Sequence, residues 1–181
     1  AVLDGTSALD LGTAQAPARW LDGVLADSPR RWSIVMIHQP FYSPRAGRDN
    51  AELREYLLPV IRRHGVDLVL QGHDHVYGRR LDEGGRLPVF AVSVTGAKQY
   101  RLSPGARDTM APVAEDTQLF QVIRVDGDRL RYEARTATGR LYDAFELAGP
   151  RGERRLVEQA DGRIDQRLCS RARTLKGRSD R

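Results

Sequence analysis

The chain alternates between two hydrophobic patterns, and this alternation limits the folds that it can adopt. Residues 14–26 and 50–64 carry apolar side chains at helical spacing, which predicts two amphipathic helices. Residues 32–37 and 66–70 are short apolar runs, typical of strands that are buried on both faces. Helix, strand, helix, strand in this order predicts a layered α/β fold in which helices cover a sheet.

The later part of the chain is rich in strand patterns, which lie at residues 88–94, 119–125, 130–136 and 141–147. Residues 126–128 and 139–140 are turn sequences, so the last three strands should form antiparallel hairpins that complete the sheet. Residues 96–117 form a long predicted loop, and such loops usually carry function or move. At the start, residues 2–3 predict a strand that is followed by a turn at residues 4–7.

Composition limits what the fold needs in order to be stable. At 181 residues, the chain can bury a core large enough to fold without a metal or a disulfide, so a metal would serve chemistry. Cys169 is the sole cysteine, which excludes an internal disulfide and a cysteine-based zinc cluster. No apolar run approaches the roughly 20 residues of a membrane span, so no membrane partner is expected.

The net charge of +5 is concentrated at one end of the chain. Residues 150–181 hold ten Lys and Arg and five Asp and Glu, whereas residues 1–149 carry 19 of each sign. We expect residues 1–149 to form the folded unit and residues 150–181 a basic, mobile tail. The tail has no Phe, Tyr or Trp for base stacking, which favours a solvated terminus over a nucleic-acid arm. Nucleic-acid binding would show a steep salt dependence that disappears when the tail is removed.

Histidines follow both apolar strands of the first half. His38 comes directly after the first strand, and His73 and His75 come after the second, where Gly72 permits a tight turn. Ligands of α/β folds gather at the carboxyl ends of strands, and imidazoles are common ligands of zinc, iron and manganese. Three histidines at one rim therefore predict a metal site. His64 ends a helix, where a cation complements the helix dipole, so it is left out of the site.

These residues resemble a known family. Residues 66–79 read VDLVLQGHDHVYGR and are similar to the GHxH segment of the calcineurin-like metallophosphoesterases, in particular the purple acid phosphatase branch. Residues 37–42 read IHQPFY and resemble the preceding histidine segment of that family. The resemblance implies a layered α/β sandwich of the αββα type, of which residues 1–149 would be the carboxyl-terminal half.

The resemblance also implies a dinuclear metal site that hydrolyses phosphate esters, as an acid phosphatase or a phosphodiesterase does. Two ions of iron, zinc or manganese would activate water and polarise the phosphoryl oxygens. His38 and His73 would bind one ion and His75 the other, as the catalytic ligands. Asp74 would brace the loop behind the ligands. Further candidates for the phosphate side of the site are Tyr77, Arg79 and Lys98.

The chain departs from the family in its acidic and amide ligands. No aspartate stands two residues before a histidine, Gly127-Asp128 lacks a second aspartate three residues later, and Asn50 is the sole asparagine. The Asp-x-His, Gly-Asp-x-x-Asp and Asn-His motifs of the family are therefore missing. We expect truncation: an amino-terminal half of the same domain would supply these ligands, and the chain alone would be inactive, bind metal weakly and expose a sheet face.

A second interpretation comes from a different functional class. A chain that keeps this fold without its acidic ligands would be a non-catalytic interaction module. The coding sequence upstream of Ala1 separates the two, since the missing motifs either occur there or do not. The compartment stays open at this point, although the resemblance is compatible with a secreted or periplasmic protein.

Overall fold

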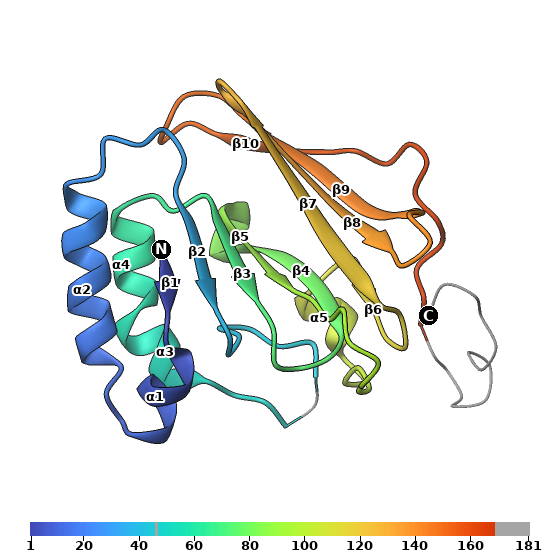
Figure 1. Ribbon diagram of the computed structural model, residues 1–181, viewed down its shortest axis with the longest axis horizontal. Coiled ribbons are helices and arrows are strands. Elements are labelled where there is room, and N and C mark those ends of the chain that lie inside the picture. The colour runs from blue at the N-terminus through green and yellow to red at the C-terminus, as the bar shows by residue number, and fades with distance from the viewer. Residues whose placement is uncertain (46, 169–181) are drawn as a thin grey trace.

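The computed structural model describes residues 1–45 and 47–168, and it is built from three layers (Figure 1). Four helices form the first layer: α1 (Gly5–Asp10), α2 (Gln15–Ala26), α3 (Ala51–Tyr56) and α4 (Leu58–Arg63). They cover one face of a six-stranded sheet, and a four-stranded sheet packs on the other face. The layered α/β class predicted from the hydrophobic patterns is confirmed.

The first sheet has a parallel centre and an antiparallel margin. Its strands lie in the order β1 (Val2–Leu3), β2 (Ile34–Ile37), β3 (Leu68–Gln71), β5 (Arg86–Val92), β4 (Tyr77–Asp82) and β6 (Val113–Ala114). The first four are parallel to one another, whereas β4 pairs antiparallel with both β5 and β6. Helices bury one face of the parallel strands, and the second sheet buries the other face of β3 and β5, which suits short apolar strands.

The helices contribute an apolar stripe to a core that they share with the first sheet. Leu21 of α2 and Leu53 of α3 have no exposed surface there, and Ile61 of α4 packs in the same cluster. The single helix expected over residues 50–64 is two helices that join at Leu57. Pro59 stands in the first turn of α4 and has no backbone N–H to continue the α3 ladder, which explains the break.

Two segments near the predicted site differ from the sequence expectation. Residues 4–7 are the start of a helix, because the Asp4 carboxylate accepts the backbone N–H of Ser7 at 3.0 Å and caps α1. Residues 77–82 form the strand β4 (Tyr77–Asp82), which was not predicted because the segment has no hydrophobic run. β4 is joined to β5 by the short 3-10 helix η1 (Glu83–Gly85) and forms a hairpin with it.

The last strands form a second sheet in the order β10 (Arg155–Glu158), β9 (Leu141–Ala148), β8 (Arg129–Thr136) and β7 (Leu119–Asp126). The hairpins were predicted, but the expectation that they complete the first sheet is wrong. Their inner faces carry Leu130, Tyr132 and Phe145, which are buried against Leu68 and Val89 of the first sheet. A sheet with one apolar face must be covered on that face, and the first sheet covers it.

The predicted tail begins inside the folded unit. β10 pairs along β9, and Arg154 just before it is buried, where its Nη1 lies 2.5 Å from Asp67 Oδ1 and its guanidinium 3.7 Å from the Trp32 ring centroid. Residues 150–168 therefore belong to the second sheet and its surroundings, and the rest of the predicted tail lies outside the described residues. Over the described part of the chain, no helix has the length and apolar character of a membrane span.

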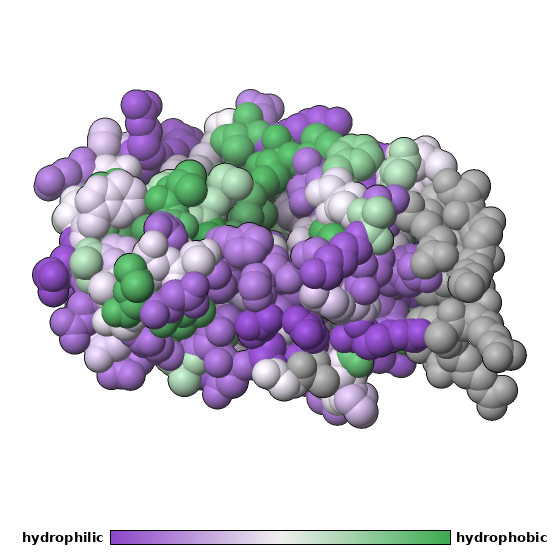
Figure 2. All heavy atoms as spheres, turned by 60° about the horizontal axis from the view of Figure 1, so that its bottom comes forward, coloured by the Kyte–Doolittle hydropathy of each residue, from purple (hydrophilic) through white to green (hydrophobic). Residues whose placement is uncertain are grey.

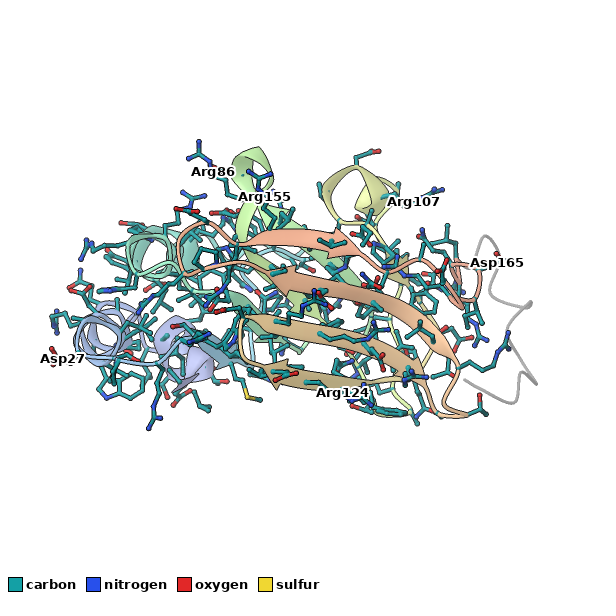
Figure 3. All side chains as sticks on the ribbon, turned by 90° about the horizontal axis from the view of Figure 1, so that it is seen from above. Asp27, Arg86, Arg107, Arg124, Arg155 and Asp165 are labelled. Carbon is teal, nitrogen blue, oxygen red and sulfur yellow. The ribbon has the colours of Figure 1, made fainter. Side chains whose placement is uncertain are left out.

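The outer face of the second sheet carries a charge cluster that makes stability depend on pH. Arg131, Arg135 and Arg124 donate to the Glu133 carboxylate at 2.8, 2.9 and 3.3 Å, with Arg124 on the edge strand β7 (Figure 3). Burial alone would raise the pKa of Glu133, but these hydrogen bonds lower it to about 2. An acid whose folded pKa is depressed stabilises the fold above its unfolded pKa, and this stabilisation is lost as the pH falls through the folded value.

We therefore expect Glu133 to contribute about 1 to 2 kcal/mol near neutral pH, since its arginine partners are partly solvated. Urea unfolding of the wild type and of Glu133→Gln at several pH values measures this contribution. The difference in unfolding free energy between the two proteins should shrink as the pH falls from about 4.5 to about 2. A difference that stays constant over this range would contradict the assignment.

Candidate metal and phosphate site

Three of the four histidines meet at the carboxyl ends of β2 and β3. The two strands pair in parallel with Ile37 opposite Gln71, so the residues that follow each strand are neighbours. The backbone N–H of Gly72 donates to the carbonyl of His38 at 3.0 Å, which extends the pairing by one step. Nε2 of His38 and Nδ1 of His73 are 3.1 Å apart, with the two rings edge to face.

The backbone of the histidine loop adopts an uncommon conformation. His73 and His75 have φ angles of 68° and 51°, in the left-handed region that glycine and asparagine favour. The Asp74 N–H donates to the Gly72 carbonyl at 2.8 Å, so the loop is tightly turned. Such a conformation at two side-chain-bearing residues costs of order 1 to 3 kcal/mol each, and residues of this kind cluster at functional sites.

Asp74 is fully buried and holds the histidine loop against the segment that follows β2. Its Oδ1 accepts the Nε–H of Arg48 at 2.9 Å, and its Oδ2 accepts the hydroxyl of Ser43. Both partners come from residues 43–48, which lie between β2 and α3. The Asp74 carboxylate therefore connects two loops beside the histidines, and both of its oxygens are already bonded, one to Arg48 and one to Ser43.

The tautomer of His75 follows from its partner. Its Nδ1 lies 2.8 Å from the carbonyl oxygen of Lys98, and a carbonyl can only accept, so Nδ1 carries the proton. Nε2 is then left with a free lone pair, which is the arrangement that a metal-binding imidazole requires. Burial, followed by the charge of Arg48, lowers the pKa of His73, which favours the neutral ring that binds cations.

Comparison with known proteins agrees with this geometry. The calcineurin-like phosphoesterase family model matches residues 3–77, which contain β1 to the end of the histidine loop. Residues 3–77 are thus similar to the calcineurin-like phosphoesterases. The resemblance drawn from the two histidine motifs is thereby confirmed.

The matching relatives include purple acid phosphatases, and the matching solved structures share the fold. Purple acid phosphatase 17 of Arabidopsis thaliana is 38% identical over 87 residues, which are 48% of this chain and 25% of that protein. The purple acid phosphatase PPD1 of yellow lupin superposes with a TM-score of 0.64 at 18% identity, over 81% of this chain and 30% of that one. GAP50 of Plasmodium, an anchor in the inner membrane complex, superposes with a TM-score of 0.58 at 16% identity, over 92% of this chain and 49% of that one. The chain thus spans about a quarter of its curated relative.

The histidines fit part of a phosphoesterase metal site. Two ring nitrogens that share one ion at about 2.1 Å lie about 3.0 to 3.4 Å apart, depending on the angle at the metal. The His38 and His73 nitrogens, 3.1 Å apart, meet this requirement. Among residues 1–45 and 47–168, however, no group of three or more His, Cys, Asp or Glu side chains could hold a metal ion. The described chain brings two imidazole nitrogens together and has a third imidazole on the same loop, which is short of a complete ligand set.

Tyr77 and Arg79 occupy a different place from the one predicted. Both were expected on the phosphate side, but they stand two residues apart on β4 and are buried under the second sheet. The Tyr77 hydroxyl and the Arg79 Nε each donate to Asp143 Oδ2 at 2.6 Å, and Arg79 also pairs with Glu158. Residues two apart on a strand share one face, and this face looks away from the histidine loop into the sandwich. Their contacts join the two sheets.

The surroundings of the histidines include Lys98, which the sequence singled out, and other residues that it did not. Lys98, predicted on the phosphate side, gives its carbonyl to His75, and its neighbour Tyr100 packs its ring 4.9 Å from the His75 ring. Arg45 and Arg48 arrive from the loop after β2. Lone charged residues in two long loops carry no periodic signal, so their convergence could be found only in the folded chain.

An apolar groove leads from the first sheet to His38. It has a volume of about 380 Å³, and His38 and Gly72 lie in its wall. The other lining residues come from β1, β2, β3, β5 and β7 or directly follow them: Val2, Leu3, Met36, Ile37, Leu70, Gln71, Ser93 and Gln121. Val2 is 71% and Met36 48% exposed, and Figure 2 shows apolar atoms gathered in a patch on one face of the molecule. The first sheet therefore exposes apolar side chains beside the His38 segment.

Proposed function

We propose that the protein containing this chain is a metal-dependent phosphoric ester hydrolase, an acid phosphatase or a phosphodiesterase, whose dinuclear site takes its imidazole ligands from His38, His73 and His75. The observation that carries the proposal is the meeting of His38 and His73 at the carboxyl ends of two paired parallel strands, where their ring nitrogens are 3.1 Å apart, with His75 on the same loop as His73. The family match over the same residues supports it.

Each histidine would have a defined task. His38 and His73 would hold one ion between Nε2 and Nδ1, and His75 would offer Nε2 to the other ion while its Nδ1–H stays on the Lys98 carbonyl. When bound, two such ions supply an activated water and charge stabilisation for in-line displacement at phosphorus, and iron, zinc or manganese suit imidazole ligands. Asp74, through Arg48 and Ser43, would keep the histidine loop in place.

The remaining ligands would come from an amino-terminal part of the same catalytic domain, so the chain alone would be inactive. Two observations support this part of the proposal. The described residues hold no complete ligand set, and the relatives that match are at least about four times as long as the matching stretch. With two ligands for one ion and one for the other, the isolated chain would bind metal weakly.

The groove beside His38 is where we propose that this amino-terminal part docks. Val2 and Met36 expose apolar surface on the rim of the groove, which is typical of a surface that another element covers. Gln71 in its wall has a buried side-chain amide nitrogen with no hydrogen-bond partner among the described residues. A docking segment would cover the apolar side chains, satisfy this donor and bring carboxylates to the histidine pair.

Hydrolysis of a chromogenic phosphate monoester and a diester by the full-length protein, with zinc, iron or manganese added, tests the proposal. Exchange of His73 and His75 for alanine should lower kcat/KM at least about 100-fold, because it removes one ligand from each ion. His64→Ala is the matched control, since that ring binds Asp22 at 2.7 Å, outside the site, and its activity should be unchanged. Full activity of the double variant would overturn the assignment.

A non-catalytic interaction module is the second candidate. The fold alone also occurs in GAP50, which is described as an anchor, and the absence of a complete ligand set among the described residues fits such a role. The upstream coding sequence decides between them. Asp-x-His, Gly-Asp-x-x-Asp and Asn-His motifs there would support the hydrolase, and their absence would support the module.

A further inference from the structure

Two long loops meet next to His75 and form a surface that the metal chemistry does not use. The segment after β2 and the loop of residues 96–105 are joined by a bridge between Arg45 and Leu102 and by a hydrogen bond from Ser103 N–H to the Pro44 carbonyl at 2.8 Å. The Tyr100 N–H donates to the His75 carbonyl at 3.1 Å. These backbone contacts fix the two loops to each other and to the histidine loop.

Tyr100 is the centre of this surface. The Arg45 guanidinium carbon lies 4.1 Å from the centroid of its ring, and the Lys98 ammonium nitrogen lies 5.1 Å from it. The His75 ring packs against the same tyrosine at 4.9 Å. Cations within about 6 Å of an aromatic face are held there by the ring quadrupole. The tyrosine thus places two cations beside the histidines without inserting them among the imidazoles.

The charge of these two cations is not neutralised within the described chain. Neither Arg45 nor Lys98 has a carboxylate within 4.0 Å among residues 1–45 and 47–168, whereas Arg48 is paired with Asp74. An arginine that stacks on a ring uses the face of its guanidinium, so its N–H groups stay free along the edge. Such an edge matches two phosphate oxygens, and a lysine adds a point charge that suits the same anion.

We propose that Arg45, Tyr100 and Lys98 form a subsite for a second phosphate on the substrate. The inference rests on the proposed hydrolase function and names its substrate class: phosphate esters or anhydrides that carry a further phosphate next to the one being hydrolysed. The imidazoles and their ions take the first phosphate, and the Arg45 edge and the Lys98 ammonium take the second. Tyr100 is a positioning residue, because it holds both cations and contacts the His75 ring.

Calorimetric titration of the 181-residue chain with tripolyphosphate and with orthophosphate, without metal and at fixed ionic strength, tests the subsite. Wild type should bind tripolyphosphate more tightly than orthophosphate. The double variant Arg45→Gln, Lys98→Gln should lose about tenfold or more of its tripolyphosphate affinity, as expected for lost charge-assisted hydrogen bonds. The matched control Arg30→Gln, Arg107→Gln also removes two exposed positive charges, with Arg107 on α5 (Ala106–Thr109) away from the site, and should keep its affinity (Figure 3).

Equal affinities of the double variant and its control, or no binding of tripolyphosphate by the wild type, would overturn the subsite. Arg45→Lys, which keeps the charge and removes the planar edge, should show an intermediate loss; full retention of affinity would contradict the role given to that edge. In the full-length protein, Arg45→Gln should lower kcat/KM for a diphosphate ester more than for p-nitrophenyl phosphate. Equal losses would overturn the subsite and leave the hydrolase standing, whereas activity that survives the histidine exchanges overturns the hydrolase itself.

Discussion

Replacing Asp143 by alanine is expected to lower the free energy of unfolding by about 3 to 5 kcal/mol, because it leaves a buried cation without its main partner. Asp143 has no exposed surface and accepts hydrogen bonds from the Tyr77 hydroxyl and the Arg79 Nε, both at 2.6 Å. Only 4% of the Arg79 side chain is exposed. The variant would leave this guanidinium with Glu158, which is itself half exposed, as its remaining partner.

Urea denaturation followed by circular dichroism measures this loss, and Asp128→Ala is the matched control. Asp128 pairs with Arg31 at 2.5 Å, but both side chains are more than half exposed, so its removal should cost less than about 1 kcal/mol. Similar losses for the two aspartates would show that the contacts between the sheets are not what stabilises β4 under the second sheet.

Phe90→Ala is expected to destabilise the chain by about 3 to 5 kcal/mol, the usual cost of a cavity left by a buried phenylalanine. Phe90 lies in β5 without exposed surface, and its ring centroid is 5.6 Å from that of Phe41 and 5.1 Å from that of Tyr42. Phe41 follows the His38 turn and donates its N–H to Gln71 Oε1 at 2.6 Å. The cavity would therefore also loosen the support of the histidine pair.

Phe120→Ala provides the comparison, since Phe120 on β7 is 37% exposed and its loss should cost about 1 kcal/mol or less. Proton and nitrogen NMR spectra of the two variants add a local readout. Shifted signals of His38 and Gly72 are expected in Phe90→Ala and unchanged ones in Phe120→Ala. A Phe90→Ala variant as stable as Phe120→Ala would mean that the surrounding side chains collapse into the space.

The parts of the fold that follow from local periodicity could be predicted from the sequence. The helix α2, the helical stretch of α3 and α4, and the parallel strands β2 and β3 depend on apolar side chains at regular spacing, which a single sequence displays. The strand β4 could not be found this way, because its inward face carries Arg79, whose burial depends on Asp143 more than 60 residues later. The strand β10 was also missed, because it lies in a basic segment whose Arg154 is buried through its pairing with the distant Asp67.

The candidate site also has a part that could be predicted from the sequence and a part that could not. His38, His73 and His75 could be predicted to meet, since the carboxyl ends of neighbouring parallel strands lie side by side. Tyr77 and Arg79 were placed by their nearness in sequence to the histidines, but a strand turns alternate side chains to opposite faces, and theirs is the inner one. The convergence of Arg45 with Tyr100 depends on how two loops fold together, which no local pattern encodes.

The left-handed backbone at His73 and His75 has an evolutionary consequence. Glycine would relieve the strain at both positions, so selection for stability alone would favour its replacement of these histidines. A descendant without the proposed ligand binding would gain stability by drifting to glycine or asparagine at these two sites. Stability and the proposed ligand binding therefore favour different residues at these two positions of the loop.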